Sequence, residues 1–467
     1  MHGKPMDKSD CQKATGKFYP PHAKPLTGTE SFVYSTWKFL RNPVEGFGPL
    51  SYSQPIASVK SFGVQMHVVS DPDAMAEVLT KHAKAFQKSP LDQRIMSAAT
   101  KEGLLSVHDA QWRKQRRAVA PMFQHRHMAD LAPDVTEVIA SFTQKIGAGG
   151  EVELSTAMAD VTFDVLAKAL LGDPQGLDRD TLRVATRRVV TSAGTLRPDD
   201  LVPWDFIPGM KGFPRILGPR GFLAIKRLRT AADALLKARR DGEPTDDLVG
   251  LLVGAKDPKT GEGLSLQEQR DNLIGFFIAG HETTALTLTW ALYLLGRDQA
   301  VQDRLRAEVQ NVVGSNPIKF EDINSLSFTR AVIDETMRLY PPAPVLARMC
   351  RETTEVAGRI IEPNDIVILA NYVMHRREQF WDDPLAFDPE RFIRKPELRS
   401  KGAAYMPFGG GPRICEGAAF ALMEAVMVLG SLVRDYKIIV PDDCYPRPLM
   451  TVTLRPEGGI KAQMERV

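Results

Sequence analysis

The chain has 467 residues, and its 60 lysines and arginines nearly balance its 57 aspartates and glutamates, for a formal net charge of +3. With 43% hydrophobic residues, this balance excludes a disordered tail protein and a protein that binds nucleic acid over its whole surface. The length provides ample chain for a large core, and we expect one domain over 1–467 with a polar, proline-containing extension at 1–30.

The four cysteines are scattered, and none forms a CxxC pair. They are Cys11, Cys350, Cys415 and Cys444. This pattern excludes a disulfide framework and a conventional zinc or iron–sulfur site, and it fits a reducing compartment. The first 25 residues are polar and lack the apolar core of a signal peptide or membrane anchor. We therefore expect a cytoplasmic protein without a membrane anchor.

Stretches with apolar residues every three or four positions predict helices along much of the chain. In chain order they cover 128–146, 156–171, 222–240, 265–297, 299–313, 325–340 and 417–434. Short runs typical of strands are fewer, and they lie at 62–69, 358–362, 366–370 and 451–455. The sequence thus predicts a mainly α protein with small β-sheets at one side of a helical body.

The most apolar segment, 271–296, has the length of a membrane span but carries His281, Glu282, Thr283 and Thr284 near its middle. Because a charged residue at the centre of a bilayer costs about 3 kcal/mol, we interpret the segment as a helix through a globular core. A carboxylate buried there needs a partner or a function. Close approach of another group would explain Gly280, just before the polar residues. Alternatively, the polar side chains simply bond to neighbouring elements of the core.

A cysteine near the carboxyl end lies in a glycine-rich loop, residues 407–417, just before an amphipathic helix. Such a loop can direct backbone N–H groups at the Cys415 sulfur, and the helix dipole and Arg413 add positive potential. We therefore expect a thiolate rather than a thiol. A thiolate could be a nucleophile, which needs a base, or a metal ligand. One thiolate suffices for a haem iron, because the porphyrin supplies four nitrogens.

Here the sequence resembles the cytochrome P-450 superfamily. The signature Phe-x-x-Gly-x-Arg-x-Cys-x-Gly is matched by Phe408, Gly411, Arg413, Cys415 and Gly417. The resemblance implies the cytochrome P-450 fold, with haem b (heme b, iron protoporphyrin IX) between the long central helix and the cysteine loop, and Cys415 as the metal ligand. Glu416 departs from the family, which more often has an apolar residue there.

Two further motifs of the family follow in the expected order. Glu335 and Arg338 match Glu-x-x-Arg, and Arg391 lies in the Pro-Glu-Arg-Phe segment at 389–392. Residues three apart on a helix share a face, so Glu335 and Arg338 can reach a common third group. The resemblance assigns these three residues to a structural network that stabilises the cysteine loop.

The segment 279–284, Ala-Gly-His-Glu-Thr-Thr, resembles the oxygen-activation motif of the family. The resemblance assigns Glu282 and Thr283 as the catalytic acid–alcohol pair and places Ala279 against the haem. Cleavage of the O–O bond consumes two protons, which a hydroxyl and a nearby carboxylate can relay. For the haem propionates the resemblance points to Trp112, Arg116, Arg348 and Arg413, since arginine binds carboxylates at two points. Phe408 is a further expected contact of the haem.

The resemblance implies a monooxygenase that inserts one atom of dioxygen into an apolar organic substrate. A peroxide-driven peroxygenase of the same fold and a non-enzymatic haem sensor are the alternatives. The chain has no GxGxxG or GxxxxGK[ST] motif, so no flavin or nicotinamide site is expected. Electrons would then come from a ferredoxin or flavodoxin-like protein with its reductase.

Two further residue sets complete the predictions. Candidate docking charges for the electron donor are Arg113, Lys114, Arg117, Arg394, Lys395, Arg399 and Lys401. Candidate apolar contacts for the substrate are Trp204, Phe206, Ile207, Met210, Phe213, Ile278, Ala279, Val345 and Leu346.

Overall fold

The computed structural model describes residues 16–61, 63–172, 179–194, 197, 200, 215, 218–242, 245, 247–400 and 402–467. The helices in these parts are α1 (Phe32–Arg41), α2 (Pro49–Ser53), α3 (Pro72–Ala76), α4 (Pro90–Thr100), α5 (Asp109–Val119), α6 (His125–Ile146), α7 (Leu154–Leu171), α8 (Arg179–Gly194), α9 (Pro219–Asp241), α10 (Leu248–Gly254), α11 (Leu266–Arg297), α12 (Gln299–Val313), α13 (Ser327–Leu339), α14 (Asn371–Met374), α15 (Arg391–Arg394) and α16 (Ala418–Asp435).

The strands form four small sheets. They are β1 (Ile56–Ser61), β2 (Val64–Val69), β3 (Phe86–Lys88), β4 (Gly149–Glu153), β5 (Leu346–Cys350), β6 (Thr354–Val356), β7 (Arg359–Ile361), β8 (Ile366–Leu369), β9 (Tyr436–Ile439), β10 (Pro448–Met450), β11 (Leu454–Pro456) and β12 (Lys461–Arg466). The largest sheet has the order β1-β2-β8-β5-β3, in which only β2 and β8 run parallel. The others are β4-β12-β9, β10-β11 and β6-β7.

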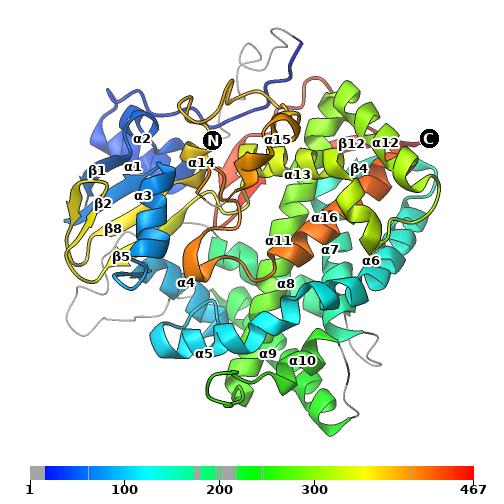
Figure 1. Ribbon diagram of the computed structural model, residues 1–467, viewed down its shortest axis with the longest axis horizontal. Coiled ribbons are helices and arrows are strands. Elements are labelled where there is room, and N and C mark those ends of the chain that lie inside the picture. Colours follow the sequence, from blue (N-terminus) through cyan, green and yellow to red (C-terminus); the bar gives the residue numbers. More distant parts are fainter. Residues whose placement is uncertain are drawn as a thin grey trace.

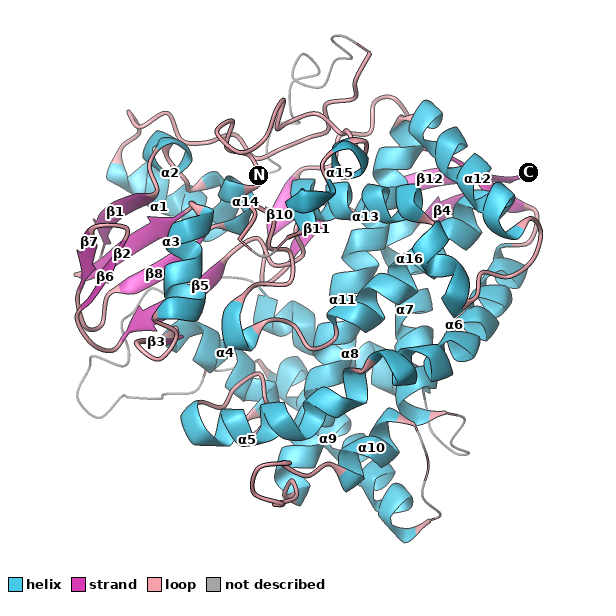
Figure 2. Cartoon of the chain, viewed as in Figure 1, coloured by secondary structure: helices cyan, strands magenta, loops and turns pink. Residues whose placement is uncertain are grey.

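The sheet β1-β2-β8-β5-β3 lies at one side of a larger helical body, as Figures 1 and 2 show. Helix α11 runs through the middle of that body and packs against α7, α9, α13 and α16. It begins with a capping box, in which Ser265 and Glu268 satisfy each other's backbone N–H groups. Most of its carboxyl-terminal half is buried, including Trp290, which stacks on Tyr340 with ring centroids 3.8 Å apart.

The helices predicted from periodicity are all present, with ends shifted by a few residues. The predicted mainly α fold with small sheets is therefore confirmed. The strand prediction at 451–455 is wrong in its first half, because Thr451 N–H donates to the Thr453 carbonyl in a tight turn and β11 begins only at Leu454. In the described part of the chain, no helix is long and apolar enough to cross a membrane, and α11 is a core helix.

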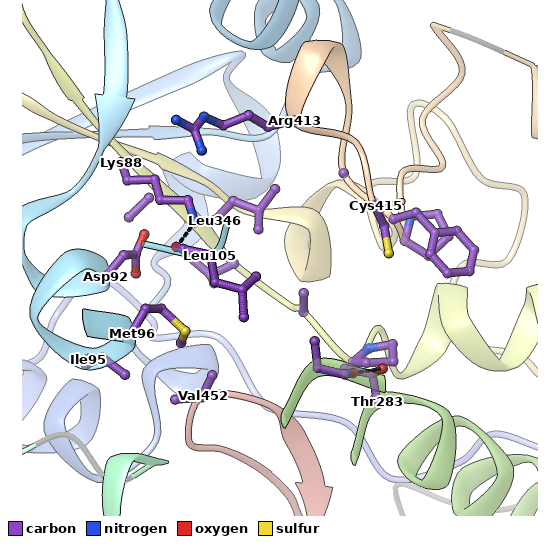
Figure 3. Close-up of a pocket in the computed structure, with 18 of the residues that line it drawn as sticks. Lys88, Asp92, Ile95, Met96, Leu105, Thr283, Leu346, Arg413, Cys415 and Val452 are labelled. Carbon is purple, nitrogen blue, oxygen red and sulfur yellow. Dashed lines mark hydrogen bonds between the residues drawn. The ribbon is translucent and has the colours of Figure 1, made fainter. Parts of the chain in front are cut away.

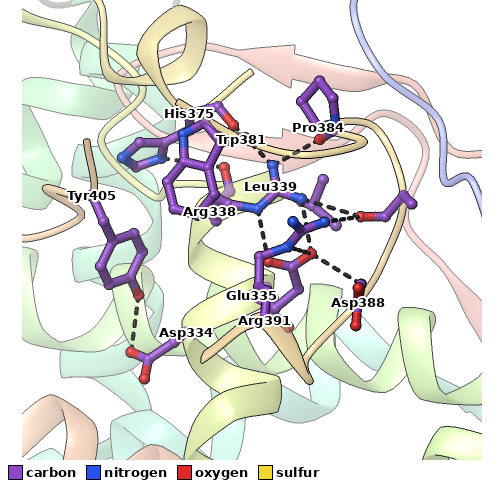
Figure 4. A network of polar contacts seen from close by, with 12 residues as sticks. Asp334, Glu335, Arg338, Leu339, His375, Trp381, Pro384, Asp388, Arg391 and Tyr405 are labelled. Atoms are coloured by element: carbon purple, nitrogen blue, oxygen red, sulfur yellow. Dashed lines mark hydrogen bonds and ion pairs between the residues drawn. The ribbon is translucent and has the colours of Figure 1, made fainter. Parts of the chain in front are cut away.

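A buried ionic network joins α13 to the segment that precedes the cysteine loop (Figure 4). The Arg338 guanidinium binds both carboxylate oxygens of Glu335, at 2.7 and 2.8 Å, and Arg391 Nε lies 3.1 Å from the same carboxylate. Arg338 also donates to the carbonyls of His375, Pro384 and Ala386. The predicted structural network therefore holds the segment 375–391 against α13.

His375 carries this network to the cysteine loop. Its Nδ1 lies 3.2 Å from the Arg338 carbonyl, and its Nε2 accepts a hydrogen bond from Met406 N–H at 3.1 Å. Burial, together with the charges of Arg338 and Arg376, lowers the pKa of His375 to about 3. The ring is therefore neutral at physiological pH, so that Nδ1 donates while Nε2 accepts. The neutral tautomer fixes the chain directly before Pro407 and Phe408.

We expect Arg338→Met to lower the free energy of unfolding by about 3–5 kcal/mol, because it leaves the buried Glu335 without its main partner. Arg330→Met is the matched control on the same helix. Arg330 pairs with Asp334 at 3.0 Å but is partly exposed, so its loss is expected to cost less than about 1 kcal/mol. Urea unfolding of both variants measures the difference, and equal effects would contradict the assigned role of Arg338.

Candidate haem-binding site

A cavity of about 840 Å³ lies between α11, α4, β5 and the cysteine loop. Figure 3 shows Cys415 and Thr283 on one side of it and Lys88 and Asp92 on the other. Of the nine predicted site residues, only Glu282 does not line this cavity. The eight that do are Trp112, Arg116, Ala279, Thr283, Arg348, Phe408, Arg413 and Cys415. The structure thus brings together residues that are up to about three hundred positions apart in the sequence.

The cysteine loop needs its glycines. Gly409 and Gly411 have φ angles of +73° and +66°, which residues with a side chain rarely adopt. A Cβ atom on Gly411 would also collide with the carbonyl oxygen of Leu79. Cys415 N–H donates to the Phe408 carbonyl at 3.0 Å, which closes the loop and presents the thiol to the cavity.

Effects of opposite sign act on the Cys415 thiol, which the sequence argument expects to be a thiolate. Burial raises its pKa, whereas the Gly417 backbone N–H and the charge of Arg116 lower it. The sequence argument counted the groups that stabilise the anion and left out the effect of burial. A cation bound in the cavity would favour the anionic sulfur.

Two arginines at the cavity edge, Arg348 and Arg413, have no carboxylate in direct contact among the described residues. Burial and the charge of Arg348 lower the pKa of Arg413 to about 10, and burial also lowers the pKa of Arg348. The Arg413 guanidinium lies 4.3 Å from the centre of the Trp112 ring, which fixes its position. Arg348 is buried and Arg413 is partly buried, and two neighbouring cations of this kind favour binding of an anionic group such as a pair of haem propionates.

Arg116 differs from this pair because it already has partners. Its side chain forms an ion pair with Glu416 and donates to the Ile414 carbonyl at 2.7 Å. The unusual acidic residue after Cys415 therefore binds the arginine that the sequence assigned to a propionate. Only part of the Arg116 guanidinium remains for the cavity.

Glu282 and Thr283 are adjacent in α11 but point in different directions. The Thr283 hydroxyl lines the cavity and donates to the Ala279 carbonyl at 2.7 Å. The Glu282 carboxylate instead pairs with Arg455 of β11, and burial raises its pKa while Arg455 opposes that effect. Successive residues on a helix are about 100° apart, which explains the separation. The predicted acid–alcohol pair is therefore not assembled within the cavity.

The remaining predictions had mixed outcomes. Gly280 is close to a protein side chain, because a Cβ atom there would lie 3.1 Å from a Leu166 methyl group. Val345 and Leu346 line the cavity as predicted, whereas Ile278 packs against the core. The other proposed substrate contacts, Trp204, Phe206, Ile207, Met210 and Phe213, lie outside the described residues.

Sequence reasoning missed Lys88 and Asp92, which face the cavity from β3 and α4 (Figure 3). The signal was weak, because Ser89-Pro90 is an ordinary helix start and charged residues around it suggest a solvated surface. Ser89 does cap α4, accepting a hydrogen bond from Asp92 N–H at 3.1 Å. This cap fixes where the Asp92 side chain leaves the helix.

Comparison with known proteins decides the family. The family model described as "Cytochrome P450" matches residues 50–464. The chain belongs to the cytochrome P450 family. Among its P450 relatives, a cytokinin hydroxylase of Arabidopsis thaliana is 30% identical over 84% of this chain and 77% of that protein. Cyclooctatin synthase of Streptomyces melanosporofaciens is 28% identical over 89% of this chain and 90% of its own.

A second protein of Streptomyces melanosporofaciens, cyclooctat-9-en-7-ol 5-monooxygenase, is 28% identical over 90% of this chain and 91% of its own. The predicted family and enzyme class, a P450 monooxygenase, are thereby confirmed. The family implies a haem-thiolate cofactor, and the cavity fits one. A cysteine thiol lies at one face, and at the edge lie two arginines, Arg348 and Arg413, that have no direct carboxylate partner in the described part of the chain.

Proposed function

We propose that this P450 is a monooxygenase that oxidises an apolar organic substrate with dioxygen, using haem b held by Cys415. One observation carries the proposal: the Cys415 thiol, the Thr283 hydroxyl and the guanidinium groups of Arg348 and Arg413 all face one cavity of about 840 Å³. When bound, the haem supplies the oxygen-activating iron and takes up electrons singly. The chain's own residues bind it, supply protons and position the substrate.

Each residue has a distinct role in the proposal. Cys415 is the metal ligand, while Arg348 and Arg413, with Trp112 behind Arg413, bind the propionates. Ala279 and Phe408 provide apolar contacts to the faces of the ring. Arg116 acts mainly through Glu416, and the pair lies directly beside the ligand.

Protons reach the substrate side through Thr283. Its hydroxyl is held by the Ala279 carbonyl, where α11 meets the cavity, and can pass on a proton from water. Glu282 is a proton reservoir, and its carboxylate must leave Arg455 before it can serve the cavity. This arrangement makes Arg455 a positioning residue for Glu282.

The substrate is an apolar molecule of moderate size. Ile95, Met96 and Val452 line the side of the cavity away from Cys415, and Leu105 and Leu346 line its middle (Figure 3). The names of two bacterial relatives refer to cyclooctatin and cyclooctat-9-en-7-ol, and one plant relative is named for cytokinins. A hydrocarbon skeleton that carries few polar groups is consistent with this lining.

Electrons come from a separate ferredoxin or flavodoxin-like protein with its reductase. Arg113 on α5 is exposed near the haem edge and is the best docking charge. Most other candidates have carboxylate partners: Lys114 binds Glu268, Arg117 binds Asp257, Arg394 binds Asp388, Lys395 binds Asp382 and Arg399 binds Asp334. Lys401 lies outside the described residues.

The proposal predicts a red-shifted Soret band for the reduced, carbon monoxide-bound protein, as thiolate ligation requires. Cys415→Ser should abolish this band. Cys444→Ser is the matched control, since Cys444 is also a free thiol but does not line the cavity. A Cys415→Ser protein that keeps the band, or a wild type that stays colourless after haem reconstitution, would contradict the proposal.

Thr283→Ala should leave haem binding intact but divert electrons from product to hydrogen peroxide, because the hydroxyl that passes protons is lost. The measurement is the ratio of product formed to electron donor consumed. Thr287→Ala, one turn further along α11, is the control, since its hydroxyl also bonds to a backbone carbonyl and lines the cavity. Unchanged coupling in Thr283→Ala would remove Thr283 from proton delivery.

Arg113→Glu should slow reduction by an acidic electron donor severalfold at low salt, and the difference should shrink as salt screens the charges. Lys461→Glu, an exposed charge on β12, is the control. Stopped-flow reduction of the haem measures both. Equal rates in the two variants would exclude α5 from the docking surface.

A further inference from the structure

The cavity side opposite Cys415 contains an acidic residue that the proposed reaction does not use. Asp92 points into the cavity from the first turn of α4 (Figure 3). Two other acidic residues line the cavity, but Glu416 pairs with Arg116 and Asp200 pairs with Arg215 at 2.6 Å. Asp92 makes no direct ion pair with the residues that the structure describes. Its carboxylate is therefore available to a ligand.

The Asp92 carboxylate lies near the Ser89 hydroxyl and the Ala347 backbone N–H, and both lower its pKa. An ionised carboxylate has about four acceptor sites, so two such neighbours still leave acceptor sites for the cavity. Burial raises the pKa of Asp92, while the charges of Arg348 and Lys88 oppose that effect. Such a group gains strongly from one more hydrogen-bond donor.

Lys88 lies beside Asp92 and shares the same surroundings. Its ammonium donates to the Leu105 carbonyl, which leaves donors for the cavity. Burial, reinforced by the charges of Arg413 and Arg348, lowers the pKa of Lys88 to about 7, while Asp92 raises it. Lys88 and Asp92 thus provide a donor and an acceptor next to each other at an otherwise apolar wall.

Lys88, Asp92, Arg348 and Arg413 all line this part of the cavity. The proposed function assigns Arg348 and Arg413 to the two propionates of a haem. An acidic side chain would repel a propionate, so Asp92, with Lys88 beside it, is left to face the space for substrate.

We propose that Asp92 and Lys88 bind a hydroxyl group of the substrate, at the end of the molecule away from the carbon that is oxidised. A hydroxyl suits both partners, since it donates to Asp92 and accepts from Lys88. A carboxylate would be repelled by Asp92, and an ammonium group by Lys88. The substrate is thus an apolar skeleton that already carries an alcohol. This inference rests on the proposed function.

The test uses the haem-loaded protein and matched pairs of probes, dodecanol with dodecane and farnesol with farnesene. Displacement of water from the iron by each probe changes the haem spectrum, and the titration gives a dissociation constant. We expect each alcohol to bind about tenfold or more tightly than its hydrocarbon, because a hydrogen bond to a buried charged group is worth that much. Alcohols that bind no better than hydrocarbons would overturn the proposal.

Three variants locate the effect. Asp92→Ala should remove the preference for alcohols, and Asp92→Asn, which keeps an acceptor oxygen, should retain part of it. Met96→Ala is the matched control on α4, since it should weaken both members of each pair equally and leave their ratio unchanged. An unchanged ratio in Asp92→Ala would overturn the proposal. Weaker retention of haem together with an unchanged ratio would assign Asp92 to the cofactor instead.

The carbon monoxide spectrum separates this inference from the proposed function. A wild type with the thiolate band and no preference for alcohols defeats only the anchor at Asp92 and Lys88. A wild type without the band defeats the proposed function itself. If Asp92→Ala fails to fold, the wild-type ratio and the Asp92→Asn protein still decide.

Discussion

The buried ion pair of Arg338 with Glu335 is the interaction on which the site depends. It lies at the meeting point of α13, the segment 375–391 and, through His375, the chain that enters the cysteine loop. Neither charge is accessible to water, so each is stable only while the other is in place. The position of the Cys415 thiol opposite α11 is therefore set by a network that touches neither cofactor nor substrate.

Two arginines of the cavity are in the opposite electrostatic situation, because they lack a carboxylate in direct contact among the described residues. They are Arg348, which is buried, and Arg413, which is partly buried, whereas Arg116 and Arg338 are compensated by carboxylates. The difference separates structural from ligand-binding arginines, although all four belong to motifs of the same family. Compensation within the protein, rather than the residue type, indicates which charges await a ligand.

Much of this site was predictable from the sequence, because the cysteine loop and α11 are local motifs whose residues are close in the chain. Residues Thr283, Phe408 and Cys415 face one cavity, as the motifs implied. What failed depended on distant partners. Arg455 turns Glu282 away, and Glu416 occupies Arg116. Neither of these partners lies near its target in sequence, and Lys88 and Asp92 belong to no motif.

Burial raises the pKa of Cys415 and lowers the pKa values of Arg348 and Arg413. One haem would give all three side chains a partner of opposite charge. Iron favours the thiolate, and propionates favour the guanidinium ions, so the cofactor removes several desolvation costs in one step. Any ligand that binds the folded state alone raises its stability by mass action. Folding of the cysteine loop and retention of haem are therefore thermodynamically linked, while α13 and its ion pair provide the rigid support for both.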